Sequence, residues 1–385
     1  MAMSRRRPRI LYLPNEPGDA IQGGPRFALG GLLDAGLIED VRIVSLLKRV
    51  QVSADGPAER ARLLQIVRDF KPTVVLLDNP KFTGLGSRDI RAWRSVSDFA
   101  FIHTDMDANH WFYQPLQREA RALARHTDLV FAPGSGEMIR NFRRWGARDV
   151  RWRPQTYDPN THGRLDITGD TVTRDVVMIG SFFGRRRLAR LRRVPGLIGR
   201  ARLVAELEHE FGTQFALFGK RWDDSIGFGP LPSAEQETVL RNAWLGSVPN
   251  LEQEKAVRSA WVTANWDHFP EEPDYTSDRL PIHLACGTVH FTTWHPGDDE
   301  RFGELPFLRL VRRWQDMPAA IRSYLESTSP ADRIEHARQA RAFADSHLRV
   351  DLSLVELLNA GGAEIDPVAA REAFDGDQKR MITEE

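Results

Sequence analysis

Residues 277–293 read SDRLPIHLACGTVHFTT, a pattern that predicts one short helix leading directly into a buried strand. We expect Ser277 or Asp278 to cap the helix start, and Pro281 falls in the first turn, where its missing N–H costs little. Gly287 suits the left-handed position that ends a helix. The start of such a helix favours phosphate, because free backbone N–H groups and the helix dipole both attract anions. The segment therefore predicts an α/β fold with an anion site.

The composition is that of a globular chain, and its 385 residues are enough for two domains. The chain is 41% hydrophobic and 28% charged, and it contains no apolar run long enough to cross a bilayer. Its first residues, MAMSRRRPRILYLP, are basic but lack the apolar core of a secretory signal. Cys286 is the only cysteine, which excludes an intrachain disulfide. We expect this thiol to pack at a helix end and the protein to be cytoplasmic.

Strands and helices alternate in both halves of the chain, which predicts parallel sheets covered by helices on both faces. The predicted strands are residues 9–13, 41–45, 73–77, 99–103 and 129–132, then 175–180, 214–219, 262–265 and 289–293. The predicted helices are residues 23–33, 59–70, 116–124 and 134–146, then 200–211, 251–259, 277–287, 317–327 and 331–348. On the helix over 59–70, the expected buried residues are Ala61, Leu64, Ile66 and Val67. The expected domains are residues 1–155 and 175–350, both Rossmann-like, with a linker over 156–174 and a C-terminal helix or tail over 351–385.

Two loops in the second half combine small residues with cations directly after a predicted strand. Residues 180–187 read GSFFGRRR, and residues 219–222 read GKRW. Open parallel sheets bind ligands at the carboxyl ends of their strands. Small residues let backbone N–H groups approach an anion there, and Arg and Lys supply positive charge. With the helix that begins near Ser277, the loops predict a phosphate site with the candidate residues Ser181, Arg185, Arg186, Lys220, Trp222, Ser277, Asp278, Arg279 and His283.

Several of these residues also have a structural interpretation. Eight arginines lie between Arg185 and Arg202. A phosphate site uses roughly one or two cations, so we expect most of the others to form a solvated face or to meet an anionic partner. Trp222 either stacks on a nucleobase or fills the core. Asp278 either contacts the ligand or only caps its helix.

The three segments resemble the donor-nucleotide domain of glycosyltransferases with two facing Rossmann-like domains, the GT-B fold. The opening segment is most similar to the spore-maturation CgeB-type glycosyltransferases, whose signature is roughly Ser-x-Arg-x-x-Glu-x-x-Ala-x-Gly before a hydrophobic strand. The matching positions are Ser277, Arg279, Ala285 and Gly287. Ile282 stands at the position of the Glu that grips the ribose in the resembled enzymes. Either His283 or Asp278 replaces that Glu, or the ribose is held differently, or the donor is unusual, or donor binding has been lost.

The resemblance also implies where catalysis takes place. Retaining GT-B enzymes place a His-Asp pair of the N-terminal domain against the donor sugar, and inverting relatives use an Asp, Glu or His as general base. The segment HTDMD at the end of a predicted strand supplies His103, Asp105 and Asp107. The two aspartates alternatively cap the following turn. Because GT-B enzymes stabilise the leaving diphosphate with backbone dipoles and basic residues, the resemblance implies that neither a metal nor another cofactor is required.

Further candidates in the first half follow from the same resemblance. Gly23 and Gly24 follow the first strand, where a glycine loop lies close to the donor diphosphate in GT-B enzymes. Asp78 follows the third predicted strand, and Asn109 and Trp111 follow the fourth. These three are the candidate acceptor-binding residues, because aromatic rings often stack on sugars or on other flat acceptors.

The predicted function is transfer of a sugar from a nucleoside-diphosphate sugar to an acceptor hydroxyl. Residues 1–160 hold 25 Lys and Arg against 18 Asp and Glu, which favours an anionic acceptor such as DNA with hydroxymethylated bases. An ordinary arginine-rich surface explains the same excess, and a small molecule or a glycan is an equally open acceptor. The other candidate functions are a nucleotide-sugar epimerase or hydrolase and a non-catalytic nucleotide-sugar-binding protein. The sequence carries no signal for the oligomeric state.

Overall fold

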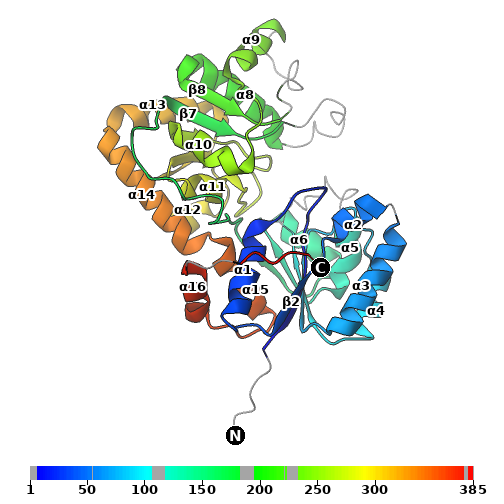
Figure 1. Ribbon diagram of the computed structural model, residues 1–385. Helices are drawn as coiled ribbons and strands as arrows, with labels where there is room; N and C mark the ends of the chain where they lie inside the picture. The colour runs from blue at the N-terminus through cyan, green and yellow to red at the C-terminus, as the bar shows by residue number, and fades with distance from the viewer. Residues whose placement is uncertain are drawn as a thin grey trace. The chain divides into compact units, whose positions relative to one another are not determined.

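The computed structural model describes residues 7–53, 55–105, 118–182, 195–220, 222, 233–376 and 380–384. The chain divides into two compact units, Met1–Pro154 with Val350–Glu385, and Gln155–Arg349. Each unit is built around a parallel sheet (Figure 1). Residues 351–385, expected as a separate helix or tail, group with the first unit, and the expected linker over 156–174 groups with the second. In the described residues, no helix has both the length and the apolar character that a membrane crossing requires.

The first unit contains a six-stranded sheet in the order β2-β1-β3-β4-β5-β6, and every neighbouring pair is parallel. The strands are β1 Arg9–Leu13, β2 Asp40–Ile43, β3 Val74–Asp78, β4 Ala100–Thr104, β5 Leu129–Ala132 and β6 Val150–Trp152. The helices are α1 Gly23–Asp34, α2 Leu46–Ser53, α3 Gly56–Phe70, α4 Ser87–Arg94, α5 Arg118–Leu123, α6 Glu137–Arg144, α15 Val350–Ala360 and α16 Pro367–Asp375.

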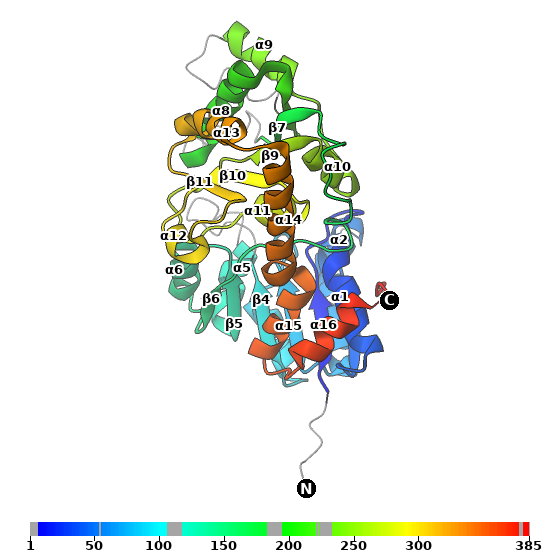
Figure 2. The same ribbon diagram turned by 90° about the vertical axis from the view of Figure 1, so that its left-hand side faces the viewer.

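Two apolar layers sandwich this sheet, because successive side chains of a strand point to opposite faces. On one face, Ile10 and Tyr12 pack with residues of α1, α15 and α16. On the other face, Leu11 and Leu13 pack with residues of α3 and α4. Figure 2 shows α15 and α16 beside α1, so the C-terminal part of the chain closes one side of the N-terminal sheet. Burial of each such side chain contributes about 1.5–3 kcal/mol.

The buried side of α3 differs from the expectation. Leu63, Val67 and Phe70 are buried, whereas Ala61 is exposed. Leu64 and Ile66 are only partly buried at the edge of the same core. The helix starts at Gly56, and its buried residues follow a spacing of three and four from Leu63 rather than from Ala61.

The second unit contains a five-stranded parallel sheet in the order β11-β10-β9-β7-β8. The strands are β7 Arg174–Ile179, β8 Phe215–Phe218, β9 Ala260–Ala264, β10 Val289–Thr293 and β11 Leu308–Val311. The helices are α8 Pro195–Phe211, α9 Ser233–Ala243, α10 Gln253–Arg258, α11 Arg279–Ala285, α12 Asp298–Phe302, α13 Met317–Ser327 and α14 Pro330–His347. Short 3₁₀ turns occur at Ala124–His126, Gly212–Gln214, Asn250–Glu252 and Trp314–Asp316. The longest described helix, α14, lies beside α11 (Figure 2).

The helix and strand of the opening segment are confirmed as α11 and β10. Gly287 has φ +72°, and a Cβ added to it would lie 2.5 Å from Ile167 Cδ1, so both conformation and space require glycine. The expected side-chain cap was wrong. Asp278 occupies the N-cap position without a side-chain capping bond, because its carboxylate pairs with Arg279 instead.

Candidate functional site: a pocket at the end of β7

The second sheet reverses its winding direction at β7. From β7 the chain crosses to β8 on one side, and it then returns to β9 on the other side of β7. Open α/β sheets bind ligands at the carboxyl ends of the strands at such a switch point. A pocket of about 520 Å³ lies at this place. It is lined by Ile179, Gly180, Ser181, Gly219, Lys220, Ser247, Val248, Pro249, Asn250, Gln253, Asp278, Arg279, Ile282 and His283.

Two cationic side chains line the pocket. Lys220 follows β8 and is exposed, and Arg279 is the first residue of α11. The Nε of Arg279 donates to the carbonyl oxygen of Ile179 at 2.9 Å, which holds the guanidinium against the end of β7. A second nitrogen of Arg279 lies 3.0 Å from Oδ1 of Asp278. Because Asp278 is largely exposed, this ion pair is weak and leaves positive charge available to a ligand.

Two glycines bring the ends of β7 and β8 together. Gly219 has φ +140°, and a Cβ on it would lie 1.8 Å from the carbonyl oxygen of Gly180. A Cβ on Gly180 would lie 3.1 Å from Nε of Arg279. The indole N–H of Trp222 donates to the Gly180 carbonyl at 2.7 Å, and that of Trp244 donates to the Gly219 carbonyl at 2.8 Å. The two indoles therefore fix the backbone that carries Ser181 and Lys220 into the pocket.

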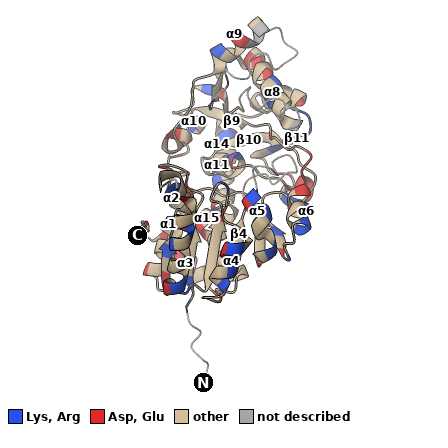
Figure 3. Ribbon diagram, turned by 90° about the vertical axis from the view of Figure 1, so that its right-hand side faces the viewer, with Lys and Arg blue, Asp and Glu red and all other residues tan. Residues whose placement is uncertain are grey.

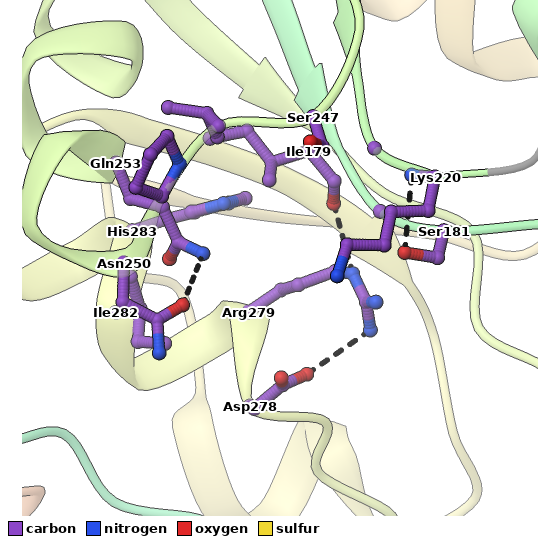
Figure 4. A pocket seen from close by; sticks show the side chains of 14 residues that line it. Ile179, Ser181, Lys220, Ser247, Asn250, Gln253, Asp278, Arg279, Ile282 and His283 are labelled. Carbon is purple, nitrogen blue, oxygen red and sulfur yellow. Dashed lines mark hydrogen bonds and ion pairs between the residues drawn. The ribbon is translucent and has the colours of Figure 1, made fainter. Parts of the chain in front are cut away.

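The part of the pocket away from Lys220 is uncharged. Gln253 Nε2 donates to Asn250 Oδ1 at 3.0 Å. Figure 4 shows Ser181 and Lys220 on one side, Asn250, Gln253 and Ile282 on the other, and Arg279 between them. Asn250 and Gln253 were not among the residues predicted from the sequence. Asn250 lies just before α10, and Gln253 is its first residue. The sequence signal for a loop here was the turn-forming stretch GSVPN, which ends in Asn250.

His283 lines the pocket from α11, as the sequence predicted, but it is not a third cation. Its side chain is buried, and Nδ1 lies 3.2 Å from Nδ1 of His290. Burial, and then the charges of His290 and Arg279, lower the pKa of His283 well below its ordinary value. At neutral pH His283 therefore contributes a neutral imidazole to the pocket lining and adds no charge.

Of the donor-site residues predicted and described in the second unit, Trp222 and Ser277 do not line the pocket. Trp222 is fully buried with its ring 5.4 Å from that of Phe182, which is the core interpretation of this residue. Ser277 is buried beside a separate small cavity that Asp267 and His295 also line. The Trp222 indole supports the loop that carries Ser181, through its bond to the Gly180 carbonyl.

The predictions for the arginine run have mixed outcomes. Arg185 and Arg186 lie outside the described residues. The expectation that the later arginines form a solvated face was wrong for Arg200, which is fully buried in α8 and donates from Nε to the carbonyl oxygen of Trp266 at 2.7 Å. An arginine at this depth depends on protein acceptors and not on water, here the Trp266 carbonyl and, at 3.3 Å, Oδ1 of Asn265.

In the first unit, His103 and Asp105 lie together at the end of β4, and Asp78 ends β3 beside Thr104. His103 Nε2 lies 3.6 Å from Oδ2 of Asp105, and both side chains are buried. Burial lowers the pKa of His103 to about 3, so its imidazole is neutral at physiological pH. Burial also raises the pKa of Asp78, whose Oδ1 accepts from Thr104 Oγ1 at 2.8 Å. The catalytic and acceptor-binding roles of these residues stay predictions, and Asp107, Asn109 and Trp111 lie outside the described residues.

Gly23 and Gly24 form the first turn of α1, and their donor role likewise stays a prediction. Arg26, the cation nearest to them in sequence, already forms an ion pair within the protein. Arg26 is buried and pairs with the carboxylate of Glu16 at 2.6 Å, and Ser45 Oγ donates to the same carboxylate. The strand ends of the first sheet thus carry an internal ion pair.

Comparison with known proteins agrees with this architecture. Sucrose-phosphate synthase from Thermosynechococcus elongatus is 13% identical, with a TM-score of 0.57 over 92% of this chain and 99% of that one. The Anabaena protein HepE in complex with UDP is 15% identical, with a TM-score of 0.54 over 91% and 100% of the two chains. A DNA-modifying β-glucosyltransferase is 14% identical, with a TM-score of 0.51 over 96% and 100%.

The chain has the GT-B fold. Residues 192–358 match the model of a protein family described as glycosyl transferase-like. No curated protein sequence matches the chain significantly. The matched segment contains every pocket residue from Gly219 to His283, and Ile179–Ser181 precede it.

Proposed function

We propose that the pocket at the end of β7 binds the nucleoside diphosphate of a sugar donor, and that the protein transfers this sugar to an acceptor hydroxyl. The observation that carries the proposal is the meeting of Lys220 and Arg279 at the switch point of the second sheet. The glycosyl transferase-like match over residues 192–358 supports it, as do the solved structures of this fold that hold UDP or UDP-glucose.

The two sides of the pocket suit the two ends of a nucleoside diphosphate. Phosphate oxygens accept charge-assisted hydrogen bonds from Lys220 and Arg279. A nucleobase and a ribose are neutral, so they suit the side formed by the amides of Asn250 and Gln253 and by the apolar side chain of Ile282. Arg279 matches the arginine of the CgeB-type signature, and we give it a phosphate-binding role here. The carboxylate that hydrogen-bonds the ribose in that family is replaced by Ile282, so the amides of Asn250 and Gln253 form these hydrogen bonds instead.

The proposed reaction breaks the bond between the anomeric carbon and the diphosphate and forms a bond from that carbon to the acceptor oxygen. Negative charge builds up on the leaving diphosphate, and positive groups fixed in advance stabilise it. Arg279 is held in advance by its bond to the Ile179 carbonyl, which Gly180 leaves room for. We propose that these cations suffice and that EDTA does not reduce turnover.

Isothermal titration with UDP, ADP, GDP and dTDP tests the donor site. We expect one nucleotide to bind, and Lys220→Ala or Arg279→Ala to weaken it about 10- to 100-fold, since each removes a charge-assisted contact of roughly 1.5–3 kcal/mol. Lys255→Ala is the matched control, because Lys255 is exposed on the same unit and does not line the pocket. If the nucleotide binds Lys220→Ala as tightly as it binds Lys255→Ala and the wild type, the proposed donor site is wrong.

The reaction class is tested with the sugar form of the nucleotide that binds. Release of the nucleoside diphosphate that depends on an acceptor identifies a transferase. Release of free sugar or formation of an isomer without an acceptor identifies the hydrolase or epimerase alternative, and binding without turnover identifies a binding protein. DNA containing hydroxymethylated bases belongs in the acceptor panel, because a DNA-modifying glucosyltransferase shares the fold and the first 160 residues are basic. Binding to DNA that falls steeply with salt supports that acceptor.

A further inference from the structure

A groove of about 510 Å³ on the first unit is lined mainly by charged side chains. Lys48 and Arg49 of α2 contribute to it, together with Glu59 and Arg62 of α3. The chain itself supplies one more lining residue, Glu384, from near its C-terminus. Figure 1 and Figure 3 both show α2 beside α3, the two helices that line the groove.

The carboxylate of Glu384 makes two contacts in this groove. Its Oε1 accepts from Nε of Arg49 at 2.6 Å and from the backbone N–H of Ser45 at 3.1 Å. A charged side chain and a backbone N–H that converge on one oxygen form a carboxylate or phosphate site. The position also suits ligand binding, because Ser45 comes just after β2, at the carboxyl edge of the sheet.

The segment that carries Glu384 is anchored independently of that carboxylate. The carbonyl oxygen of Ile382 accepts from Arg26 at 3.0 Å, and the side chain of Ile382 packs against the core under α1. The ion pair of Glu384 is partly exposed, at 22% for Glu384 and 27% for Arg49. Exposed and half-exposed pairs are weak, so the carboxylate is able to leave while Ile382 stays in place.

The charge balance of the groove favours a further anion. Three cations line it, and Glu59 is engaged by Arg62 at 2.6 Å. Among the residues that the structure describes, Lys48 has no ion-pair partner. Lys48 therefore adds positive charge beside the two donors that Glu384 uses, the Arg49 guanidinium and the Ser45 N–H.

We propose that this groove is a binding site for a ligand that carries a carboxylate or phosphate group, and that Glu384 occupies the site until such a ligand displaces it. The site is separate from the donor pocket and does not depend on the proposed transferase activity. The C-terminal segment thereby acts as an internal competitor, which lowers the affinity of the groove for weak anions and leaves it open to strong ones.

The test measures binding of a fluorescein-labelled triglutamate peptide to the full-length protein by fluorescence anisotropy at low salt. We expect Glu384→Gln to bind the probe about fivefold more tightly than the wild type, because it removes the internal carboxylate and keeps the Ile382 anchor. Adding Arg49→Ala to Glu384→Gln should abolish the gain. Glu372→Gln is the matched control for lost negative charge, since Glu372 is exposed on α16, and Arg68→Ala on α3 is the control for lost positive charge.

The outcomes separate the proposal from a general charge effect. The proposal is overturned if Glu384→Gln and Glu372→Gln bind the probe with equal affinity. It is also overturned if the gain in affinity from Glu384→Gln is as large after Arg49→Ala as after Arg68→Ala. Competition with inorganic phosphate and with glutarate at equal concentration then identifies the ligand chemistry. The stronger competitor names the group that the groove prefers, and failure of both to compete overturns the proposal. Because no sugar nucleotide is present, the result is independent of the donor experiment.

Discussion

The two sheets have the same parallel construction, but they use the cations at their strand ends differently. In the second unit, Lys220 and Arg279 line a pocket at the end of β7 and β8. In the first unit, Arg26 is buried against Glu16, and Arg49 is paired with Glu384. The two units therefore differ in how firmly carboxylates already hold these cations: Arg26 is buried against Glu16, whereas Lys220 is exposed and Arg279 pairs only with the largely exposed Asp278.

The glycines show the same contrast in steric terms. A Cβ on Gly219 would collide with the Gly180 carbonyl, and a Cβ on Gly30 would collide with the Arg380 carbonyl at 1.9 Å. The first partner is the end of a central strand, held by Trp222 from the other side. The second partner belongs to a terminal segment. The two Cβ-to-oxygen distances are therefore nearly equal, but we expect a side chain at Gly219 to destabilise the fold more than one at Gly30.

Gly219→Ala should have the largest effect, a loss of about 4 kcal/mol in the free energy of unfolding, because φ +140° and the backbone contact are both incompatible with a side chain. Urea denaturation of the purified protein measures it. Gly212→Ala is the control, since Gly212 also has positive φ, at +51°, but a Cβ there meets nothing within 4 Å. A difference of less than about 1 kcal/mol between the two variants would contradict the close packing of the strand ends.

Glu16→Gln should cost about 3 kcal/mol, because it leaves the guanidinium of Arg26 buried without a counter-charge. Burial by itself raises the pKa of Glu16, but the hydrogen bonds from Arg26, Ser45 and Gln22 outweigh burial and lower it overall. The stabilisation by ionised Glu16 is therefore present above its unfolded pKa and is lost as the pH falls through its folded pKa. Thermal melts at neutral and acidic pH measure both effects. Glu39→Gln, which breaks only an exposed pair with Arg9, should change little.

Asp298 should make the second unit less stable as the pH rises. Burial raises the pKa of Asp298 to about 6, so the folded state favours the protonated carboxyl. Between the unfolded pKa, about 4, and this folded value, the native state binds more protons, and stability falls by about 2 kcal/mol as the pH increases. The difference in melting temperature between the wild type and Asp298→Asn, followed from pH 4 to pH 7, measures this effect. A difference that stays constant with pH would rule out the shifted carboxyl.

Gly30→Ala should have the smallest effect, about 1 kcal/mol or less, because the segment at Arg380 can move away and alanine favours the helix. Displacing that segment also draws Glu384 away from Arg49. Gly30→Ala is therefore expected to raise probe binding in the groove, as Glu384→Gln does. A loss of stability as large as that of Gly219→Ala would show that the C-terminal segment is as rigidly held as a central strand.

The predictable part of the fold consists of elements whose residues are buried on a regular period. Short apolar strands such as Val289–Thr293 and Leu129–Ala132 are confirmed at their predicted bounds. The strand at Leu308–Val311 was missed because charged Arg309 interrupts its apolar run. Helix α4 was missed because only Ile90 and Trp93 of its eight residues are buried. Such elements are defined by their neighbours more than by their own pattern.

The sequence by itself determined the α/β class, the two parallel sheets and the segment at Arg279, because these depend on local periodicity and on the special conformations of glycine. Only the tertiary structure decided that Trp222 supports the Gly180 carbonyl, that Arg200 is buried, and that Asn250 and Gln253 complete the pocket. It also decided that Glu384 meets Arg49, a residue 335 positions earlier in the chain. For Trp222 and Arg200 the physical reason is that a buried polar group without a partner is costly, and their acceptors come from distant parts of the chain. Asn250, Gln253 and Glu384 are exposed or only partly buried, and no local pattern marks which distant residues they meet.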